Sequence, residues 1–256
     1  GYYTWLDYNN DGVQDFDEKV QVAVNRVQSF ELTRDMMLEA RKYGFKSINL
    51  DLIYGLPFQT LSTFEETLEK VIEISPDRIS VFNYAHLPHR FKPQRRISND
   101  DLPSADEKIL IFQNIIETLQ ANGYLYIGMD HFAKPDDELS IAQKNGELHR
   151  NFQGYTTKGE CDLLGLGVSS ISAIGNSFSQ NTKELKQYYQ QIEATGQAME
   201  QGISLSDDDL IRGAVIRDLM CNLFVDKQVI NQRYKINFDD YFRAELLSLD
   251  TFINDD

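Results

Sequence analysis

Short apolar runs alternate with amphipathic segments through the first half of the chain. The runs at residues 47–54, 78–84 and 124–129 predict strands, because each is short and carries β-branched or aromatic residues. Apolar residues spaced three and four apart between these runs predict helices. Strands separated by amphipathic helices indicate βαβ units, so the predicted class is α/β, with either a doubly wound parallel sheet or part of a (β/α) barrel.

Capping signals mark the helix ends. Capping-box patterns at residues 62–65 and 104–107 predict two helix starts. The segment 17–43 is expected to be mostly helical and to end at Gly44. The apolar face predicted for the helix after residue 104 consists of Ile109, Phe112, Ile116 and Leu119.

From about residue 206 the pattern changes to helices alone, which predicts a small helical domain. We therefore expect an atypical N-terminal segment over residues 1–18, a partial (β/α) barrel over 19–204 and a helical C-terminal domain over 205–256. The chain ends just after the apolar run 246–253. This last domain is accordingly expected to be incomplete.

The composition is that of a globular, acidic protein. The 256 residues include 40 Asp and Glu against 25 Lys and Arg, a net charge of −15, and 41% are hydrophobic. This balance argues against a nucleic-acid binder, which relies on Lys and Arg to neutralise phosphates. No signal peptide and no apolar run of about 18 residues is present in the sequence. We expect a soluble, cytoplasmic monomer with no membrane partner.

Two cysteines, Cys161 and Cys221, lie far apart in the sequence. They cannot form a disulfide framework, and no local group of thiolates for zinc or an iron–sulfur cluster accompanies them. The cysteines therefore predict no metal site.

Asp51 is the most informative single position. In the strand predicted over 47–54 side chains alternate, so Asn49 and Asp51 share a face. Strands of a parallel sheet are usually apolar on both faces, and burying an unpaired carboxylate is costly. Asp51 is therefore expected either in a structural ion pair or in a ligand cavity at the carboxyl side of the strands.

Further segments carry candidate chemistry. Asp130 and His131 follow a predicted strand end, where barrel enzymes keep catalytic groups, with a simple loop histidine as the alternative. Residues 149–155 contain donors that could clamp a carboxylated ligand. The basic cluster 86–96 indicates either an anionic small molecule or a solvated face. Residues 165–171 could bring backbone close to a ligand but lack the context of a Rossmann fingerprint.

The N-terminus fits a calcium-loop pattern. Oxygen-bearing residues alternate, a glycine follows the third of them, and a glutamate ends the loop. The candidate ligands are Asp7, Asn9, Asp11, Asp15 and Glu18. Only six residues precede the pattern, which are too few for an entering helix.

Six sequence blocks stand in order along residues 12 to about 252. They are GVQDF at 12–16, NLDLIYGLPFQT at 49–60, SVFNYAHLP at 80–88, GMDHFAKPDDEL at 128–139, HRNFQGYTT at 149–157 and LLGLGVSSIS at 163–172. With these blocks the chain resembles the oxygen-independent coproporphyrinogen III oxidases, the radical S-adenosylmethionine (SAM) enzymes of haem synthesis. The fourth and fifth blocks resemble the oxidase rather than its haem-chaperone relatives.

The resemblance implies part of a (β/α) barrel of the radical-SAM type, followed by a small, truncated helical domain. It implies a [4Fe–4S] cluster and two SAM molecules as cofactors, and a porphyrinogen and an electron donor as partners. The implied reaction is the oxidative decarboxylation of two propionate side chains of coproporphyrinogen III to vinyl groups, which yields protoporphyrinogen IX.

The SAM-contact positions of the family fall on five residues of this chain, namely Gln14, Arg26, Asp51, Ala85 and Ile171. The resemblance assigns the first four to the second SAM and Ile171 to the SAM at the cluster. It implies that Arg26 pairs with a SAM carboxylate and that Asp51 binds an amino or ribose group. The backbone at Ala85 and Ile171 would then serve adenine recognition, and catalytic residues stay unassigned.

One departure from the family pattern concerns the cluster. The Cys-x-x-x-Cys-x-x-Cys loop that the family uses is absent from this sequence. We therefore expect a fragment that lacks the cysteine-loop half of the barrel and is inactive by itself. The alternative is a non-enzymatic fragment or fusion module in which the loop 7–18 binds calcium.

Overall fold

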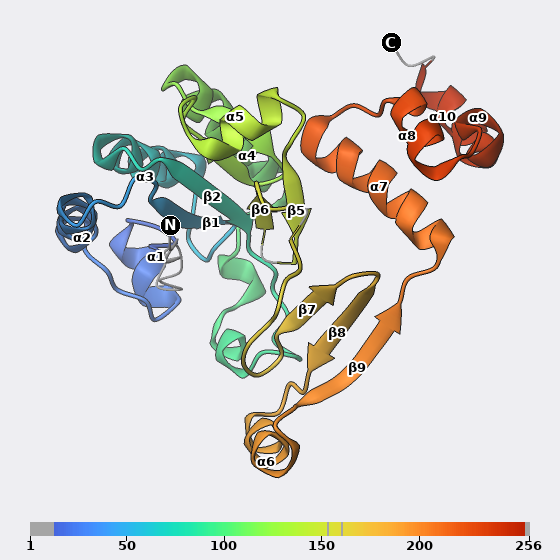
Figure 1. Ribbon diagram of the computed structural model, residues 1–256. Helices are drawn as coiled ribbons and strands as arrows, with labels where there is room; N and C mark the ends of the chain where they lie inside the picture. The colour runs from blue at the N-terminus through green and yellow to red at the C-terminus, as the bar shows by residue number, and fades with distance from the viewer. Residues whose placement is uncertain (1–12, 153, 160, 254–256) are drawn as a thin grey trace. The chain divides into compact units, whose positions relative to one another are not determined.

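The computed structural model describes residues 13–152, 154–159 and 161–253. Two compact units make up the chain, residues 1–141 and residues 142–256 (Figure 1). The domain boundaries expected from the sequence, after residues 18 and 204, stay a prediction.

Helices and strands alternate in the first unit. Its helices are α1 (Glu18–Ala23), α2 (Phe30–Lys42), α3 (Leu61–Ile74) and α4 (Ala105–Ala121), and α5 (Glu138–Lys144) runs across the boundary between the two units. Its strands are β1 (Asn49–Tyr54), β2 (Arg78–Asn83), β3 (Leu125–Gly128) and β4 (His131–Ala133). The short 3₁₀ helices η1 (Lys92–Arg96) and η2 (Asn99–Asp101) lie between β2 and α4.

The strands form one sheet in the order β1-β2-β4-β3. The strands β1 and β2 are parallel and are joined through α3, which confirms the expected βαβ unit. The third predicted strand instead forms a hairpin: β3 pairs antiparallel with β4, and β4 pairs antiparallel with β2. Gly128 (φ 145°) and Met129 (φ 53°) have positive φ, and they reverse the chain just before His131.

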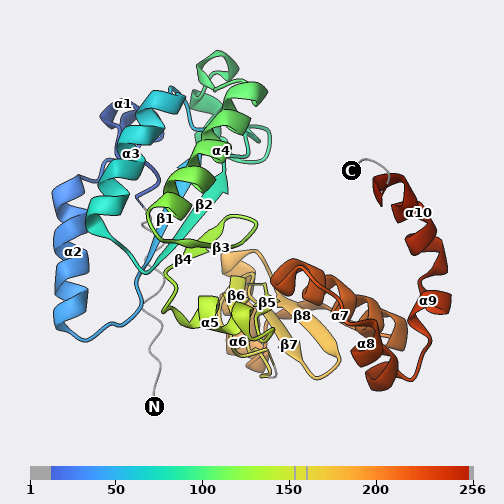
Figure 2. The ribbon, with the colours of Figure 1, turned by 90° about the horizontal axis from the view of Figure 1, so that it is seen from above.

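One face of this sheet is covered by α3 and α4, which lie side by side over β1 and β2 (Figure 2). The buried core consists of side chains from both helices and from that face of the strands. They include Leu50, Leu52, Ile79, Val81, Phe64, Leu68, Val71, Ile111, Ile115 and Leu119. Because successive side chains of a strand point to opposite faces, the residues between these strand positions lie on the other face.

The helix ends differ slightly from the sequence prediction. Thr60 rather than Ser62 caps α3 and forms a capping box with Thr63. Ser104 caps α4 as predicted, with its side chain accepting a hydrogen bond from the Glu107 N–H. The predicted apolar face of α4 was wrong in part, because Ile109 is 65% exposed whereas Ile111 and Ile115 are fully buried. The helical segment 17–43 is interrupted between α1 and α2.

The second unit has two small sheets and a helical end. The hairpin β5 (His149–Asn151) and β6 (Gly154–Thr156) is followed by the antiparallel sheet β7 (Ile171–Ile174), β8 (Ser177–Asn181) and β9 (Met199–Ser204), with α6 (Leu185–Thr195) between β8 and β9. The helices expected after residue 206 are α7 (Asp207–Asn222), α8 (Lys227–Tyr234), α9 (Phe238–Tyr241) and α10 (Arg243–Ile253). In the described part of the chain, no helix is long and apolar enough to cross a membrane.

Candidate functional site

The sheet face that α3 and α4 leave open is polar. The register pairs Asp51 of β1 with Ser80 of β2, and Ser80 with His131 of β4, so these side chains form a row across the sheet. The ring of Phe82 lies edge to face with the ring of His131, with 6.0 Å between the centroids. Sequence reasoning identified Asp51 and His131 but missed Ser80. Its signal is a small polar residue between the buried apolar Ile79 and Val81.

Asp51 is half-buried and hydrogen-bonded within this face. Asn49 donates from Nδ2 to Oδ1 of Asp51 over 2.6 Å, and the Ser80 hydroxyl donates to Oδ1 of Asn49 over 3.2 Å. Burial raises the pKa of the Asp51 carboxyl, and the bond from Asn49 only partly opposes this rise. Asp51 is therefore held by neutral donors, and no ion pair of Asp51 occurs among the described residues. The structural ion pair expected as one alternative is therefore not formed with the described residues, and the ligand-cavity interpretation stays a prediction.

His131 and Asp130 interact directly, which adjacent residues of one strand would not do. Nδ1 of His131 lies 2.6 Å from Oδ1 of Asp130, because Asp130 sits in the turn between β3 and β4 rather than in a strand. The charge on His131 lowers the pKa of Asp51 and the charge on Asp130 raises it, in addition to the larger effect of burial. The Asp130–His131 pair is therefore close enough to Asp51 to influence its pKa.

The backbone of Gln14 lies alongside β1, next to Asp51. Its N–H donates to the Asp51 carbonyl over 3.1 Å, and its carbonyl accepts from the Ile53 N–H over 2.9 Å. Gln14 has a positive φ of 63°, which is uncommon for a residue other than glycine. Gln14 and Asp51, two of the positions that the family resemblance implies, are therefore neighbours in the structure.

The side chain of Asp15 fixes the backbone next to Gln14. The Asp15 carboxylate is 1% exposed and accepts hydrogen bonds from the Thr67 hydroxyl (2.6 Å), the Asp17 N–H (2.7 Å) and the Gln59 amide. Burial raises the pKa of Asp15, against the effect of these bonds. This buried cluster ties the segment before α1 to α3 and to the loop after β1.

Arg26 and Ala85 lie in loops of the same unit. The loop of Arg26 is organised by buried Gln21, whose Nε2 donates to the carbonyls of Asp15 and Gln28, each over 2.7 Å. Ala85 is exposed and lies two residues after the end of β2 at Asn83, and its carbonyl accepts from Nε2 of Gln94 over 3.0 Å.

Asp137, from the GMDHFAKPDDEL block, has a structural role. Nε of Arg78 donates to both carboxylate oxygens of Asp137 over 3.0 and 2.9 Å, and the hydroxyl of Ser47 donates to one of them over 2.8 Å. Arg78 and Asp137 are 8% and 7% exposed. The pair joins the start of β2 to the start of α5, where Asp137 also accepts from the Leu139 N–H.

Ile171 belongs to the second unit. It begins β7 and lines a pocket of about 340 Å³ together with Phe152 and Phe178, whose rings meet edge to face at 5.1 Å. The glycine-rich segment before it is tightly packed: a Cβ on Gly165 would lie 2.6 Å from the carbonyl oxygen of Ile171. Residues 149–151 and 154–156 pair as the strands β5 and β6.

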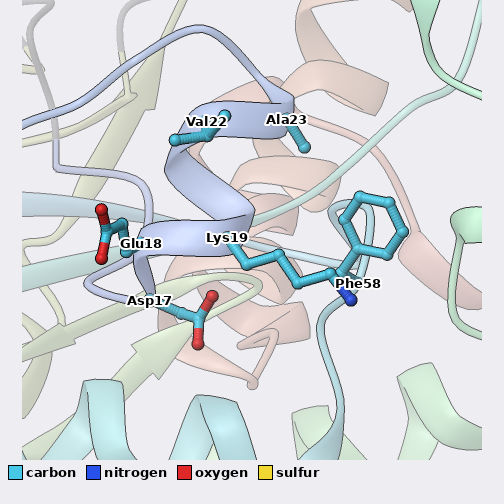
Figure 3. Close-up of a pocket in the computed structure, with 6 residues that line it drawn as sticks. All are labelled: Asp17, Glu18, Lys19, Val22, Ala23 and Phe58. Atoms are coloured by element: carbon cyan, nitrogen blue, oxygen red, sulfur yellow. The ribbon is translucent and has the colours of Figure 1, made fainter.

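A surface pocket of about 570 Å³ beside α1 contains none of the predicted cofactor residues (Figure 3). Its lining consists of Asp17, Glu18, Lys19, Val22, Ala23 and Phe58. Figure 3 shows the Lys19 side chain extended toward the Phe58 ring, and Nζ lies 4.1 Å from the ring centre. Asp17 caps α1 by accepting from the Val20 N–H. Because these charged groups already have structural roles, the polar sheet face is the stronger candidate.

The predicted calcium loop lies largely outside the described residues, since Asp7, Asn9 and Asp11 precede residue 13. Of the two described candidates, Asp15 has its carboxylate engaged by Thr67, Gln59 and Asp17, while Glu18 is exposed in the first turn of α1. Over residues 13–152, 154–159 and 161–253, no group of three or more His, Cys, Asp or Glu is placed to hold a metal ion.

Comparison with known proteins finds similar proteins over most of the chain. No family model matches the chain. A protein of Escherichia coli (strain K12) named oxygen-independent coproporphyrinogen III oxidase is 54% identical over 235 residues, which are 92% of this chain and 51% of that protein. A protein of Thermostichus vulcanus with the same name is 47% identical, over 93% of this chain and 74% of that protein.

A solved structure, described as "Coproporphyrinogen III oxidase (HemN) from Escherichia coli is a Radical SAM enzyme", matches with a TM-score of 0.93 and 54% identity. The match covers 95% of this chain and 56% of that one. The likeness confirms the predicted α/β fold class. The chain spans about half the length of most of the curated relatives it matches.

Proposed function

The chain belongs to the oxygen-independent coproporphyrinogen III oxidase family, and we propose that it supplies part of the cofactor and substrate sites of such an oxidoreductase. The reaction would be the radical-SAM oxidative decarboxylation of two propionates of coproporphyrinogen III to vinyl groups. An electron donor, a cytoplasmic location and a monomeric state belong to the same proposal.

The observation that carries the proposal is the Asp51 face. A half-buried carboxylate that forms no ion pair with the described residues is held there by Asn49, and its raised pKa reflects its burial. Each carboxylate oxygen accepts more than one hydrogen bond, so Asp51 can also accept from an amino group or ribose hydroxyls. SAM carries both kinds of donor and a positive charge that a carboxylate stabilises.

The other positions of the proposed SAM site supply complementary groups. Gln14 is fixed beside Asp51 by two backbone hydrogen bonds. Arg26 is a half-buried guanidinium in the loop that Gln21 organises, and it would pair with the SAM carboxylate in a charge-assisted bond. Backbone at Ala85 would take the adenine of the same molecule. Ile171, in its apolar pocket with Phe152, would contact the SAM at the cluster.

The residues of this chain do not fit the cluster itself. Three thiolates must reach one [4Fe–4S] cluster, whereas the sequence contains two cysteines. Cys221 is fully buried in α7, where burial raises the pKa of its thiol, and Cys161 is exposed. No step of the reaction is therefore assigned to a cluster held by this chain.

Equilibrium dialysis of the purified chain against radiolabelled SAM tests the proposal. We expect saturable binding that Asp51→Asn and Arg26→Gln each weaken about tenfold or more, as loss of a charge-assisted contact does. Asp136→Asn, an exposed carboxylate at a turn, is the charge-matched control and should bind as the parent does. Absence of binding by the parent, or equal binding by Asp51→Asn, would refute the site.

A second measurement concerns the cluster. After anaerobic reconstitution with iron and sulfide, we expect no thiolate-to-iron absorption band and no reductive cleavage of SAM. A cluster that forms on this chain and cleaves SAM would show that other ligands replace the missing cysteines.

A further inference from the structure

Residues 86–96 form a basic loop directly after Ala85, between β2 and α4. It contains Arg90, Lys92, Arg95 and Arg96 and no Asp or Glu, in a chain whose net charge is −15. Segments that follow the carboxyl ends of parallel strands face the ligand side in barrels and open α/β sheets. The loop therefore combines an unusual charge with the position where ligands of such folds bind.

The cations of the loop are available to a ligand. All four side chains are exposed. Arg95 donates from Nε to the Pro88 carbonyl over 3.1 Å, so its guanidinium is oriented by the loop itself. None of the four takes part in an ion pair with the described residues. The next acidic residues, Asp100 and Asp101, belong to η2.

Gln94 gives the loop a defined shape. Its Oε1 accepts from the Leu87 N–H over 2.5 Å, and its Nε2 donates to the Ala85 carbonyl over 3.0 Å. The Phe91 N–H donates to the Leu87 carbonyl, and the Gln94 N–H donates to the Phe91 carbonyl. A single amide thus ties η1 to the strand end, and the cations are presented from a pre-organised loop, which lowers the entropy cost of binding.

An aromatic ring lies among the charges. Phe91 is 46% exposed, and the Arg90 guanidinium lies 5.6 Å from its ring centre. Exposed guanidinium and phenyl surfaces together suit a flat apolar ring that carries carboxylates at its edge. A large acidic partner would bring its negative charges close to many carboxylates of this acidic chain and be repelled. A small anion in the loop interacts mainly with charges within a Debye length of about 8 Å, and the charges of the loop are basic. The loop accordingly favours a small polycarboxylate.

We propose that the loop 86–96 binds the carboxylates of the anionic tetrapyrrole substrate, with Gln94 as the residue that positions the loop. The inference rests on the proposed function and extends it, because it assigns the propionates to this loop while SAM lies at the Asp51 face. Each carboxylate accepts charge-assisted hydrogen bonds from the guanidinium and ammonium groups.

The test is fluorescence titration of the chain with coproporphyrin III, the stable fluorescent ring with four carboxylates. The variant Arg90→Gln/Arg96→Gln should bind about tenfold more weakly or worse, since two charge-assisted contacts are lost. Lys183→Gln/Lys186→Gln removes the same charge from exposed positions elsewhere and should bind as the parent does. Gln94→Leu keeps all four cations and should also weaken binding, with circular dichroism equal to that of the parent.

Further arms separate the competing outcomes. Deuteroporphyrin, with two carboxylates, should bind more weakly than coproporphyrin, and added salt should weaken both. Equal affinity of the Arg90→Gln/Arg96→Gln variant and the parent overturns the proposal. So does displacement of coproporphyrin by poly-glutamate at equal carboxylate concentration, which would assign the loop to an acidic macromolecule. SAM binding is measured on the parent and on the same variants. A parent that does not bind SAM refutes the proposed function. A parent that binds SAM, together with a loop variant that binds porphyrin as the parent does, refutes only the role of the loop.

Discussion

Asn49 donates a hydrogen bond of 2.6 Å to Asp51, two positions along the same strand, on the face of β1 that points away from the core. Burial raises the pKa of Asp51, and this bond limits the rise without cancelling it. The folded chain therefore binds a proton at Asp51 more readily than the unfolded chain does. An ionised Asp51 at neutral pH lowers the free energy of unfolding, as groups kept for ligand binding often do.

The first prediction is that Asp51→Asn is at least as stable as the parent at neutral pH. Because the pKa of Asp51 is raised in the folded chain, the free energy of unfolding falls as the pH rises from the ordinary carboxyl pKa through the folded pKa. It stays lower at any higher pH. The amide keeps an acceptor for Asn49 and removes the charge. The gain in the unfolding midpoint should shrink as the pH is lowered from the folded pKa to the ordinary carboxyl pKa, and should be smallest below it, which urea titrations at several pH values would measure.

Asp136→Asn serves as the control for that series, because it removes the same charge from an exposed turn. It should leave the difference between neutral and acidic pH unchanged. A loss of stability of Asp51→Asn at neutral pH would mean that the ionised carboxylate stabilises the fold and that burial does not raise its pKa.

A second prediction concerns the buried carboxylate of Asp15. Thr67→Val removes the hydroxyl that donates to Asp15 and accepts from the Phe16 N–H. Two buried polar groups lose a partner, so we expect a loss of about 1–3 kcal/mol in the free energy of unfolding at neutral pH. The deficit should narrow at acidic pH, because a protonated Asp15 needs fewer donors. Thr118→Val, half-buried on α4, is the matched control and should change stability little.

The sequence predicted the elements whose signals are local. β1 and β2 follow from short apolar runs, and α4 begins at its predicted cap, Ser104. Asp51 could be singled out because a carboxylate in a buried strand is costly without partners. The predictions of β1, β2 and the start of α4 succeeded because each depends on a residue and its immediate neighbours alone.

Features set by tertiary contacts could not be predicted in this way. Ile109, Phe112 and Ile116 share a helical face, but so do Ile111 and Ile115. Packing on the sheet buries the second set fully, whereas Phe112 and Ile116 are partly buried and Ile109 is exposed. The strand β4 has three residues, so no periodicity shows it, and it turns the Asp130–His131 segment into part of a hairpin. Asp15 fitted a local calcium pattern, whereas Thr67 and Gln59, remote in sequence, occupy its oxygens.

A third prediction follows for calcium. Coordination by Asp15 would require its carboxylate to give up buried bonds to Thr67, Gln59 and the Asp17 N–H. We therefore expect the thermal midpoint to be the same in millimolar calcium and in excess chelator, since a ligand that binds only the native state must raise it. Magnesium serves as the ionic-strength control. A rise specific to calcium, lost in Asp15→Asn, would establish the calcium loop instead.

The last prediction concerns the ion pair of Arg78 and Asp137. Arg78→Met removes the guanidinium that contacts both oxygens of a carboxylate only 7% exposed. An uncompensated buried charge remains, so we expect a loss of about 3–5 kcal/mol in the free energy of unfolding. The double variant Arg78→Met/Asp137→Asn should recover part of this loss, because the orphaned charge is gone. The amide oxygen can still accept from the Leu139 N–H, while the amide NH2, in place of the second carboxylate oxygen, can donate to the Ser47 hydroxyl. Arg34→Met, which breaks the exposed pair with Asp35, should have little effect. Amide hydrogen exchange of β1 and β2 shows where the structure loses stability. If the double variant is no more stable than Arg78→Met, lost packing rather than the orphaned charge causes the loss.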